Sequence, residues 1–194
     1  NGQRSFLTDR GVASHLAHFD STLMNDVSIL HVPTYSLTDE PLASTCVQYI
    51  NAARATGSII SIDASSSSVL TQYGTDRYRA LIQTLQPHVF LCNEDEAKVL
   101  GLGAQQPMAG AALTVIKQGP LPVIAVQHDG TTTEVAVTPV ANIVDTTGAG
   151  DAFAAGFLPH YAQTKNVGNA ITQGNSLASR VLQSPGATLN SSQQ

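Results

Sequence analysis

The chain has 194 residues, of which 42% are hydrophobic and 12% are charged, and its formal net charge is −5 at pH 7. These values are typical of one globular domain, and nine Lys and Arg residues are too few for a basic stripe that binds nucleic acid or a polyanionic membrane. No apolar run approaches the roughly 18 residues of a transmembrane helix. Cys46 and Cys92 lie in apolar segments without metal-binding spacing, and this placement indicates reduced thiols in a cytoplasmic protein.

The first predicted element is a short strand over residues 4–8, preceded by the turn signal Asn1-Gly2. A hairpin needs a strand before its turn, so this start favours a longer chain with an upstream segment; a frayed end is the alternative. Residues 9–26 predict one helical turn or a short helix. His15 and His18 in this segment suggest a metal pair, but no carboxylate or cysteine cluster completes such a site.

Strands and helices alternate in the next part of the chain. Apolar runs predict strands over residues 27–32, 58–62 and 88–92, and helical periodicity predicts helices over residues 39–56 and through residues 78–85. Successive strand–helix–strand units imply a mainly parallel sheet. We therefore predict a doubly wound α/β fold with a Rossmann-like core, flanked by helices. It forms one domain over residues 1–190, followed by a disordered tail over residues 191–194.

Polar side chains end three of the apolar runs. Asp63 follows the strand at residues 58–62, Asn93 follows the strand at 88–92, and Lys117 follows a further strand at 113–116. Because open α/β sheets bind ligands at the carboxyl ends of their strands, we expect these side chains to meet at one ligand-binding edge. Asn93 and Glu96 also form the pattern of a capping box, which begins a helix.

The remaining residues predict three helices and two strands. Residues 101–112 are rich in Gly, Ala and Gln and end in a short helix, and residues 123–127 and 131–138 form an antiparallel hairpin. A helix after Gly150 carries an apolar stripe of Phe153, Phe157 and Tyr161. Residues 167–181 predict a final amphipathic helix.

The sequence Asp-Thr-Thr-Gly-Ala-Gly-Asp at residues 145–151 begins the helix that carries Phe153, Phe157 and Tyr161. Backbone N–H groups at a helix start lack an intrahelical partner, and the helix dipole adds partial positive charge. Gly148, Ala149 and Gly150 can therefore hold a phosphate or a developing oxyanion. Asp151 can deprotonate a hydroxyl beside that group, which suits phosphoryl transfer. The structural alternative is that the glycines only begin a helix and that the dipole alone favours Asp151.

Two other phosphate-binding motifs do not fit. A Walker loop would end in Gly-Lys-Ser/Thr, which the chain lacks. A dinucleotide fingerprint would need a glycine at Phe153 and an acidic residue about 20 positions later, whereas no Asp or Glu follows Asp151. An oxidoreductase is therefore a remote alternative.

Residues 145–151 resemble the second signature of the PfkB carbohydrate kinase family, the ribokinase-like sugar and nucleoside kinases. The resemblance implies an enzyme that transfers the γ-phosphoryl group of ATP to a hydroxyl of a small sugar, with Mg²⁺ as cofactor and K⁺ as a further candidate. Gly148, Ala149 and Gly150 would form the anion hole, and Asp151 would be the catalytic base. Family members are longer than this chain, which implies that the N-terminal part and the lid are largely missing.

The same resemblance gives roles to further residues. Asn93 and Glu96 match the family's Asn-x-x-Glu motif, which is associated with Mg²⁺ and phosphate through water. Residues 184–187 match the family's terminal Gly-Ala turn, which would make Asp145 a neighbour of K⁺. The nucleotide contacts that the resemblance implies are Lys117, Gly119, Thr147 and Asn175. Pro122 stands where the family commonly has a second glycine, and for Asn175 a solvated side chain is the alternative.

The expected partners are a small sugar and ATP, with no nucleic acid and no membrane, and the family's lid makes a homodimer one option. A nucleoside kinase of the same fold is an alternative function. Another is a non-catalytic fragment that binds a nucleotide.

Overall fold

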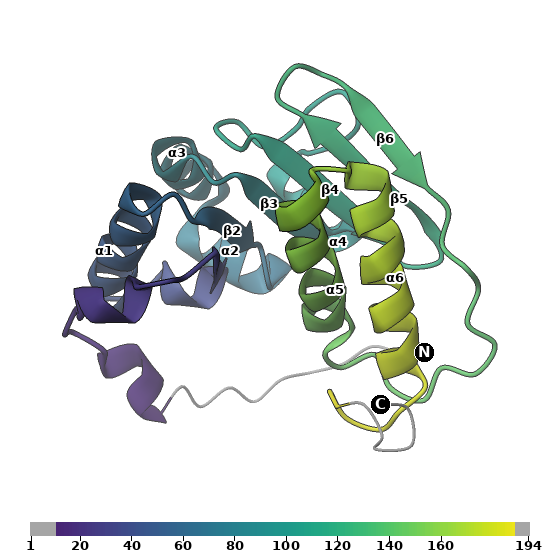
Figure 1. Ribbon diagram of the computed structural model, residues 1–194, viewed down its shortest axis with the longest axis horizontal. Coiled ribbons are helices and arrows are strands. Elements are labelled where there is room, and N and C mark those ends of the chain that lie inside the picture. The colour runs from purple at the N-terminus through teal and green to yellow at the C-terminus, as the bar shows by residue number, and fades with distance from the viewer. Residues whose placement is uncertain (1–10, 189–194) are drawn as a thin grey trace.

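The computed structural model describes residues 11–188, so the turn at Asn1-Gly2, the strand predicted over residues 4–8 and the tail predicted over residues 191–194 lie outside the described residues. Within the described range, one six-stranded sheet has the order β1-β2-β3-β4-β5-β6 (Figure 1). The strands are β1 (Ile29–Pro33), β2 (Ile59–Asp63), β3 (Val89–Asn93), β4 (Leu113–Gln118), β5 (Leu121–Gln127) and β6 (Thr132–Val135). Strands β1 to β4 run parallel, whereas β5 and β6 continue the sheet antiparallel. The strands predicted from residue 27 onward and the predicted hairpin of β5 and β6 are confirmed.

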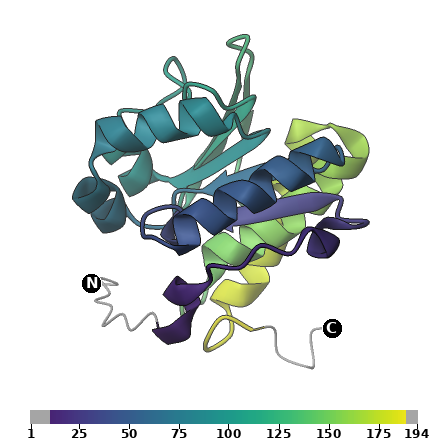
Figure 2. The same ribbon diagram turned by 90° about the vertical axis from the view of Figure 1, so that its left-hand side faces the viewer.

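Helices cover both faces of this sheet, as the doubly wound α/β prediction requires (Figures 1 and 2). The α-helices are α1 (Leu42–Ala55), α2 (Ser67–Tyr73), α3 (Thr75–Leu85), α4 (Glu94–Leu100), α5 (Ala149–Thr164) and α6 (Val167–Leu182). The helical turns predicted within residues 9–26 are the 3₁₀ helices η1 (Gly11–His15) and η2 (Ser21–Met24), and a third, η3 (Thr34–Ser36), follows β1.

The core consists of two apolar layers separated by the sheet. One layer packs beneath α1 to α4, and the other packs beneath α5 and α6. Strand β3 contributes to both, because successive side chains of a strand point to opposite faces. Phe90 and Cys92 belong to the first layer and Val89 and Leu91 to the second. All three crossover connections between the parallel strands therefore lie on one face, and the last two helices cover the other.

The prediction of a short helix at the end of residues 101–112 is wrong. The segment forms turns and an isolated bridge between Gly103 and Gln106. Gly110 has a φ of +88°, and a Cβ there would lie 2.5 Å from the Cα of Gln83 in α3. The Met108 N–H donates to Thr114 Oγ1 instead of a helical carbonyl. Close packing on α3 therefore overrides the helical composition.

Helices α5 and α6 lie side by side, as Figure 1 shows. Their close approach depends on glycine, because a Cβ on Gly156 of α5 would lie 2.5 Å from the carbonyl oxygen of Gln173 in α6. This pair places the first turn of α5 at the edge of the sheet where the parallel strands end. No helix within residues 11–188 has the length and apolar character needed to cross a membrane.

Candidate active site

Three polar side chains meet at the carboxyl ends of β2, β3 and β4, as the sequence predicts. Lys117 on β4 is the register partner of Asn93 on β3. Its ammonium lies 3.0 Å from Asp63 Oδ2 at the end of β2. Burial alone would lower the pKa of Lys117, but the charge of Asp63 and the hydrogen bond to it outweigh burial and raise the pKa. Lys117 is therefore a fixed cation at this edge.

The first turn of α5 faces the same edge. Gly148 is the N-cap residue with a φ of 76°, and a Cβ there would lie 2.5 Å from the Cβ of Ala187. The Ala149 N–H donates to the Thr146 carbonyl at 3.4 Å. The N–H groups of Gly148, Gly150 and Asp151 have no hydrogen-bond acceptor within residues 11–188. Three amides at a helix start thus stay available to an anion.

Lys117 also lies beside this turn. A Cβ on Gly150 would be 3.5 Å from Lys117 Nζ, and the ring centroid of Phe153 is 5.9 Å from the same atom. Lys117, one of the predicted nucleotide contacts, is therefore a neighbour of the residues predicted to form the anion hole. An ammonium next to backbone amides that have no acceptor is a suitable combination of donors for a phosphoryl group.

Asp151 is exposed and borders a cavity of about 270 Å³ between β1 and α5. The other residues that line it are Ile29, His31, Ala154, Ala155, Leu158 and Pro159. Apart from Asp151 and His31 the lining is apolar. The carboxylate therefore has open space in front of it in which an acceptor hydroxyl can lie.

His31 is a site residue that the sequence analysis did not identify. Its Nδ1 lies 3.1 Å from Ser61 Oγ on β2. Burial lowers the pKa of His31, and the charge of Asp63 opposes this effect. The only signal in the sequence is one polar side chain inside an apolar strand, which has no spacing relation to the motif at residues 145–151. A neutral imidazole has one N–H donor and one acceptor nitrogen, so His31 can form a hydrogen bond with the hydroxyl group of a substrate that lies beside Asp151.

Asn93 and Glu96 form the predicted capping box at the start of α4. Glu96 Oε2 accepts from the Asn93 N–H at 2.8 Å, and Oε1 accepts from Asn93 Nδ2 at 2.9 Å. The Glu96 side chain is 3% exposed, and burial raises its pKa to about 7 against the opposing hydrogen bond from Asn93. The structural role is therefore confirmed, and it leaves each carboxylate oxygen one further lone pair for water.

Asp145 joins two distant segments. Its Oδ1 accepts from the Thr147 N–H at 2.8 Å, and its Oδ2 accepts from the Gly186 N–H at 3.1 Å. Ser184, in the same terminal turn, is fully buried, and its Oγ has no hydrogen-bond partner within residues 11–188. The loop at residues 145–148 and the turn at residues 184–187 are thus one unit.

Two further predicted nucleotide contacts lie in the turn after β4 and on α6. Gly119 is at the tip of the turn between β4 and β5 with a φ of +58°, next to a register irregularity between Ile116 and Gln118. Asn175 lies on α6, and its Nδ2 is shielded from solvent without a hydrogen-bond partner among the described residues. Its burial does not fit a solvated side chain.

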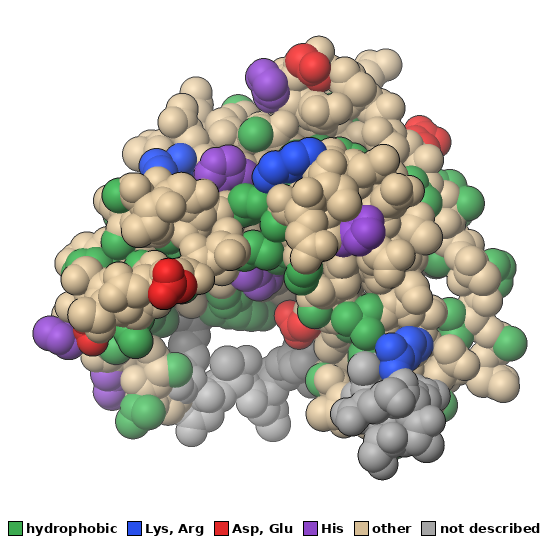
Figure 3. All heavy atoms as spheres, in the orientation of Figure 1, with side chains coloured by type: hydrophobic (Ala, Val, Ile, Leu, Met, Phe, Trp, Pro, Cys, Tyr) green, Lys and Arg blue, Asp and Glu red, His purple; other side chains and the backbone are tan. Residues whose placement is uncertain are grey.

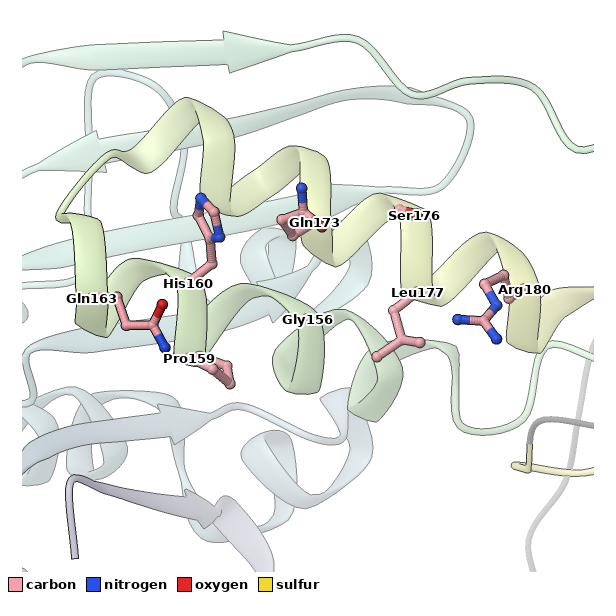
Figure 4. A pocket seen from close by; sticks show the side chains of 8 residues that line it. All are labelled: Gly156, Pro159, His160, Gln163, Gln173, Ser176, Leu177 and Arg180. Carbon is pink, nitrogen blue, oxygen red and sulfur yellow. The ribbon is translucent and has the colours of Figure 1, made fainter. Parts of the chain in front are cut away.

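A second cavity, of about 310 Å³, lies between α5 and α6. The residues that line it come from both helices, as Figure 4 shows: Gly156, Pro159, His160, Gln163, Gln173, Ser176, Leu177 and Arg180. None of the predicted site residues borders it. Within residues 11–188, no group of three or more His, Cys, Asp or Glu side chains is arranged to hold a metal ion.

The sequence of the chain is similar to those of known kinases. The profile of the pfkB family carbohydrate kinases matches residues 1–194. The 2-dehydro-3-deoxygluconokinase of Haemophilus influenzae is 46% identical over 52 residues, which cover 27% of this chain and 17% of that protein.

Two solved structures share the fold. The adenosine kinase of Sinorhizobium meliloti has a TM-score of 0.76 at 21% identity, over 87% of this chain and 53% of its own. A protein of Escherichia coli described as a ribokinase II, solved with ATP and Mg²⁺, has a TM-score of 0.73 at 18% identity, over 87% of this chain and 56% of its own. The chain thus spans about half the length of these solved structures.

Proposed function

The chain belongs to the pfkB family of carbohydrate kinases, and from this premise we propose that its protein transfers the γ-phosphoryl group of ATP to a hydroxyl of a small sugar. The observation that carries the proposal is the first turn of α5. Amides without a protein acceptor lie there beside the Lys117 ammonium, and the exposed Asp151 carboxylate of the same turn borders a cavity.

The proposed mechanism assigns one task to each group. Asp151 orients the acceptor hydroxyl and takes its proton as the oxygen attacks the γ-phosphorus. The amides of Gly148 and Gly150 and the Lys117 ammonium stabilise the charge on the phosphoryl oxygens. We place Ala149 in the same anion hole, although its amide also contacts the Thr146 carbonyl. Thr147, Gly119 and Asn175 are proposed contacts of the nucleotide.

We propose Mg²⁺ as the divalent cofactor, with Asn93 and Glu96 as the residues that hold it. One buried carboxylate whose oxygens already accept from Asn93 fits an ion that keeps most of its waters. When bound, Mg²⁺ neutralises charge on the phosphate oxygens of ATP.

A K⁺ site is proposed beside Asp145. The buried Ser184 Oγ without a partner and the Asp145 carboxylate belong to two segments that meet there. Hydroxyl and carboxylate oxygens are the hard donors that such a cation takes.

The decisive experiment replaces the proposed base in the full-length protein. Asp151→Asn should lower kcat by a hundredfold or more and leave the fold intact, because a carboxamide cannot accept the proton. Asp76→Asn, at an exposed position of α3, is the matched control and should keep the wild-type rate. An Asp151→Asn enzyme with normal kcat would remove Asp151 from the mechanism.

The acceptor can be identified with a panel of sugars, 2-dehydro-3-deoxygluconate and nucleosides. A sugar or sugar acid is our first choice because of the family and the related kinase of Haemophilus influenzae. A nucleoside is the second candidate, favoured by the largely apolar lining of the cavity beside Asp151, against which a flat base can pack. A protein that binds ATP in calorimetry but phosphorylates no acceptor would instead be a non-catalytic nucleotide-binding module.

We also propose that ATP and a small acceptor are the partners, rather than nucleic acid or a membrane. On the face in Figure 3, the Lys and Arg side chains lie in separate places and not in one stripe. Cys46 and Cys92 are buried free thiols, which supports a cytoplasmic location.

A further inference from the structure

The ion pair between Lys117 and Asp63 joins the carboxyl ends of β4 and β2, and both side chains are largely buried. The two side chains are 16% and 15% exposed. Desolvation offsets most of the Coulombic attraction of a buried pair, so two well-packed apolar side chains would stabilise the fold about as well. The presence of charges here therefore calls for an explanation other than stability.

The Asp63 carboxylate is held rigidly on its other side. Its Oδ1 accepts from the Ser65 N–H at 2.7 Å, and Ser65 has a left-handed φ of 61°, which costs free energy for a residue with a side chain. The Asp63 carbonyl accepts from Thr34 Oγ1 at 2.8 Å and from Ser65 Oγ at 3.0 Å. Each carboxylate oxygen thus has one partner, Ser65 for Oδ1 and Lys117 for Oδ2. The hydrogen bonds of the turn at residues 63–65 fix the carboxylate so that Oδ2 points towards β4.

The Lys117 ammonium lies in turn against α5. Its distance of 3.5 Å from the Cβ position of Gly150 places a positive charge next to the positive end of a helix dipole. That arrangement is unfavourable until an anion lies between them. An ammonium has three N–H donors, of which Asp63 uses one, so two remain for phosphate oxygens.

We propose that Asp63 is a positioning residue, which aims the Lys117 ammonium at the γ-phosphoryl group bound by the first turn of α5. This inference rests on the proposed kinase function. In the transfer step, the bond from the γ-phosphorus to the ADP oxygen breaks as the bond to the acceptor oxygen forms, and the hydroxyl proton passes to Asp151. Lys117 keeps its proton throughout, and Asp63 touches neither substrate.

The test uses three variants of the full-length protein: Asp63→Asn, Lys117→Met and the double variant. Asp63→Asn keeps an acceptor for the Ser65 amide but removes the charge that holds the ammonium. Each single variant should lower kcat by about tenfold or more and reduce the preference for the non-hydrolysable ATP analogue AMP-PNP over ADP in calorimetry. The double variant should show no further loss beyond about twofold, because Asp63 acts through Lys117.

Thermal unfolding separates this role from a structural one. Each single variant leaves one buried charge unpaired and should lower the Tm, whereas the double variant removes both charges and should regain Tm without regaining kcat. Asp129→Asn is the matched control, because Asp129 Oδ1 also accepts from an amide two residues later, that of Thr131 at 2.8 Å, yet it pairs with no lysine within residues 11–188. It should leave kcat and the nucleotide preference unchanged.

Two results would overturn the inference. One is a double variant that regains kcat together with Tm, since the pair would then be structural. The other is an Asp63→Asn enzyme whose kcat and AMP-PNP preference stay within about twofold of wild type. A wild-type protein that phosphorylates no acceptor would refute the proposed function instead, and the nucleotide preference of the variants would still test the role of Asp63.

Discussion

Gly148 combines two constraints that a side chain cannot meet. Its φ is 76°, and an added Cβ would lie 2.5 Å from the Cβ of Ala187. Gly130 has a φ of +86° but open space around it, so it isolates the first constraint. We expect Gly130→Ala to lower the free energy of unfolding by about 1–2 kcal/mol. Gly148→Ala should lower it by about 1–3 kcal/mol more, because the terminal turn must move. Urea denaturation measures both, and equal losses would contradict the contact with Ala187.

His88 should make the stability depend on pH. Its Nδ1 accepts from the Ile60 N–H at 2.9 Å, and burial, with a further contribution from Arg54, lowers its pKa below the ordinary value of 6.5. Above pH 6.5 both the folded and the unfolded state carry a neutral ring, so the stabilisation is complete. As the pH falls below 6.5, the unfolded state takes up the proton first, and the free energy of unfolding decreases.

Urea denaturation between pH 7.5 and 5 tests this expectation. His88→Asn, which keeps an acceptor for the Ile60 amide, should have a shallower loss than wild type. His15→Asn, at an exposed position, should follow the wild-type curve. A His88→Asn protein with the full wild-type slope would show that other groups cause the pH dependence.

At single residues, the sequence could predict what depends on local backbone and could not predict what depends on pairing. Gly148 and Asp151 were identifiable because a helix start requires particular residue types at fixed spacing. The convergence of Asp63 and Lys117 was also predictable, since both end parallel strands. Their ion pair was not, because it spans 54 positions and depends on side-chain direction. For His31, the one local signal is a polar side chain inside an apolar strand, which does not connect it to the motif at residues 145–151.

Among the elements, α5 and α6 offer the clearest test. A Cβ on Gly156 would meet the Gln173 backbone at 2.5 Å, whereas a Cβ on Gly168 of α6 has its nearest neighbour at 3.7 Å. Gly156→Ala should therefore lower the free energy of unfolding by about 1–3 kcal/mol, because the helices must separate. Gly168→Ala should raise it by up to about 1 kcal/mol through helix propensity. Chemical denaturation of both variants measures these changes in the free energy of unfolding. A Gly156→Ala protein more stable than wild type would contradict the close packing of α5 against α6.

The elements themselves were predictable where one pattern decides them. Apolar runs located β1 to β5, and the capping box located the start of α4. The prediction of a helix at the end of residues 101–112 failed because it depended on their Ala and Gly content. That content does not reveal the conformation of Gly110, which is set by contact with α3. Helix α2 and the break before α3 at Gly74, with a φ of 95°, were not predicted, because the apolar pattern indicated only one helix, through residues 78–85.

For the whole molecule, the proposed function predicts stabilisation by nucleotide. A ligand at about 100 times its Kd adds about 2.7 kcal/mol if it binds only the folded state, which raises Tm by roughly 5–10 °C for a domain of this size. ATP with Mg²⁺ should give this shift in the full-length protein, and EDTA should reduce it. Asp151→Asn should keep the shift, because the base is not needed for ATP binding. A wild-type Tm that ignores ATP would rule out a nucleotide site.

The contact between Ala187 and Gly148 links the end of the described chain to the loop that begins α5. Gly186 strengthens the link through its amide, which donates to Asp145 at a separation of 41 positions. A deep mutational scan should therefore report these two stretches as one unit. Bulky replacements of Ala187 would displace the loop that begins α5, and should lower both the amount of folded protein and its activity. Libraries built to alter acceptor choice by directed evolution would do best to leave that alanine fixed.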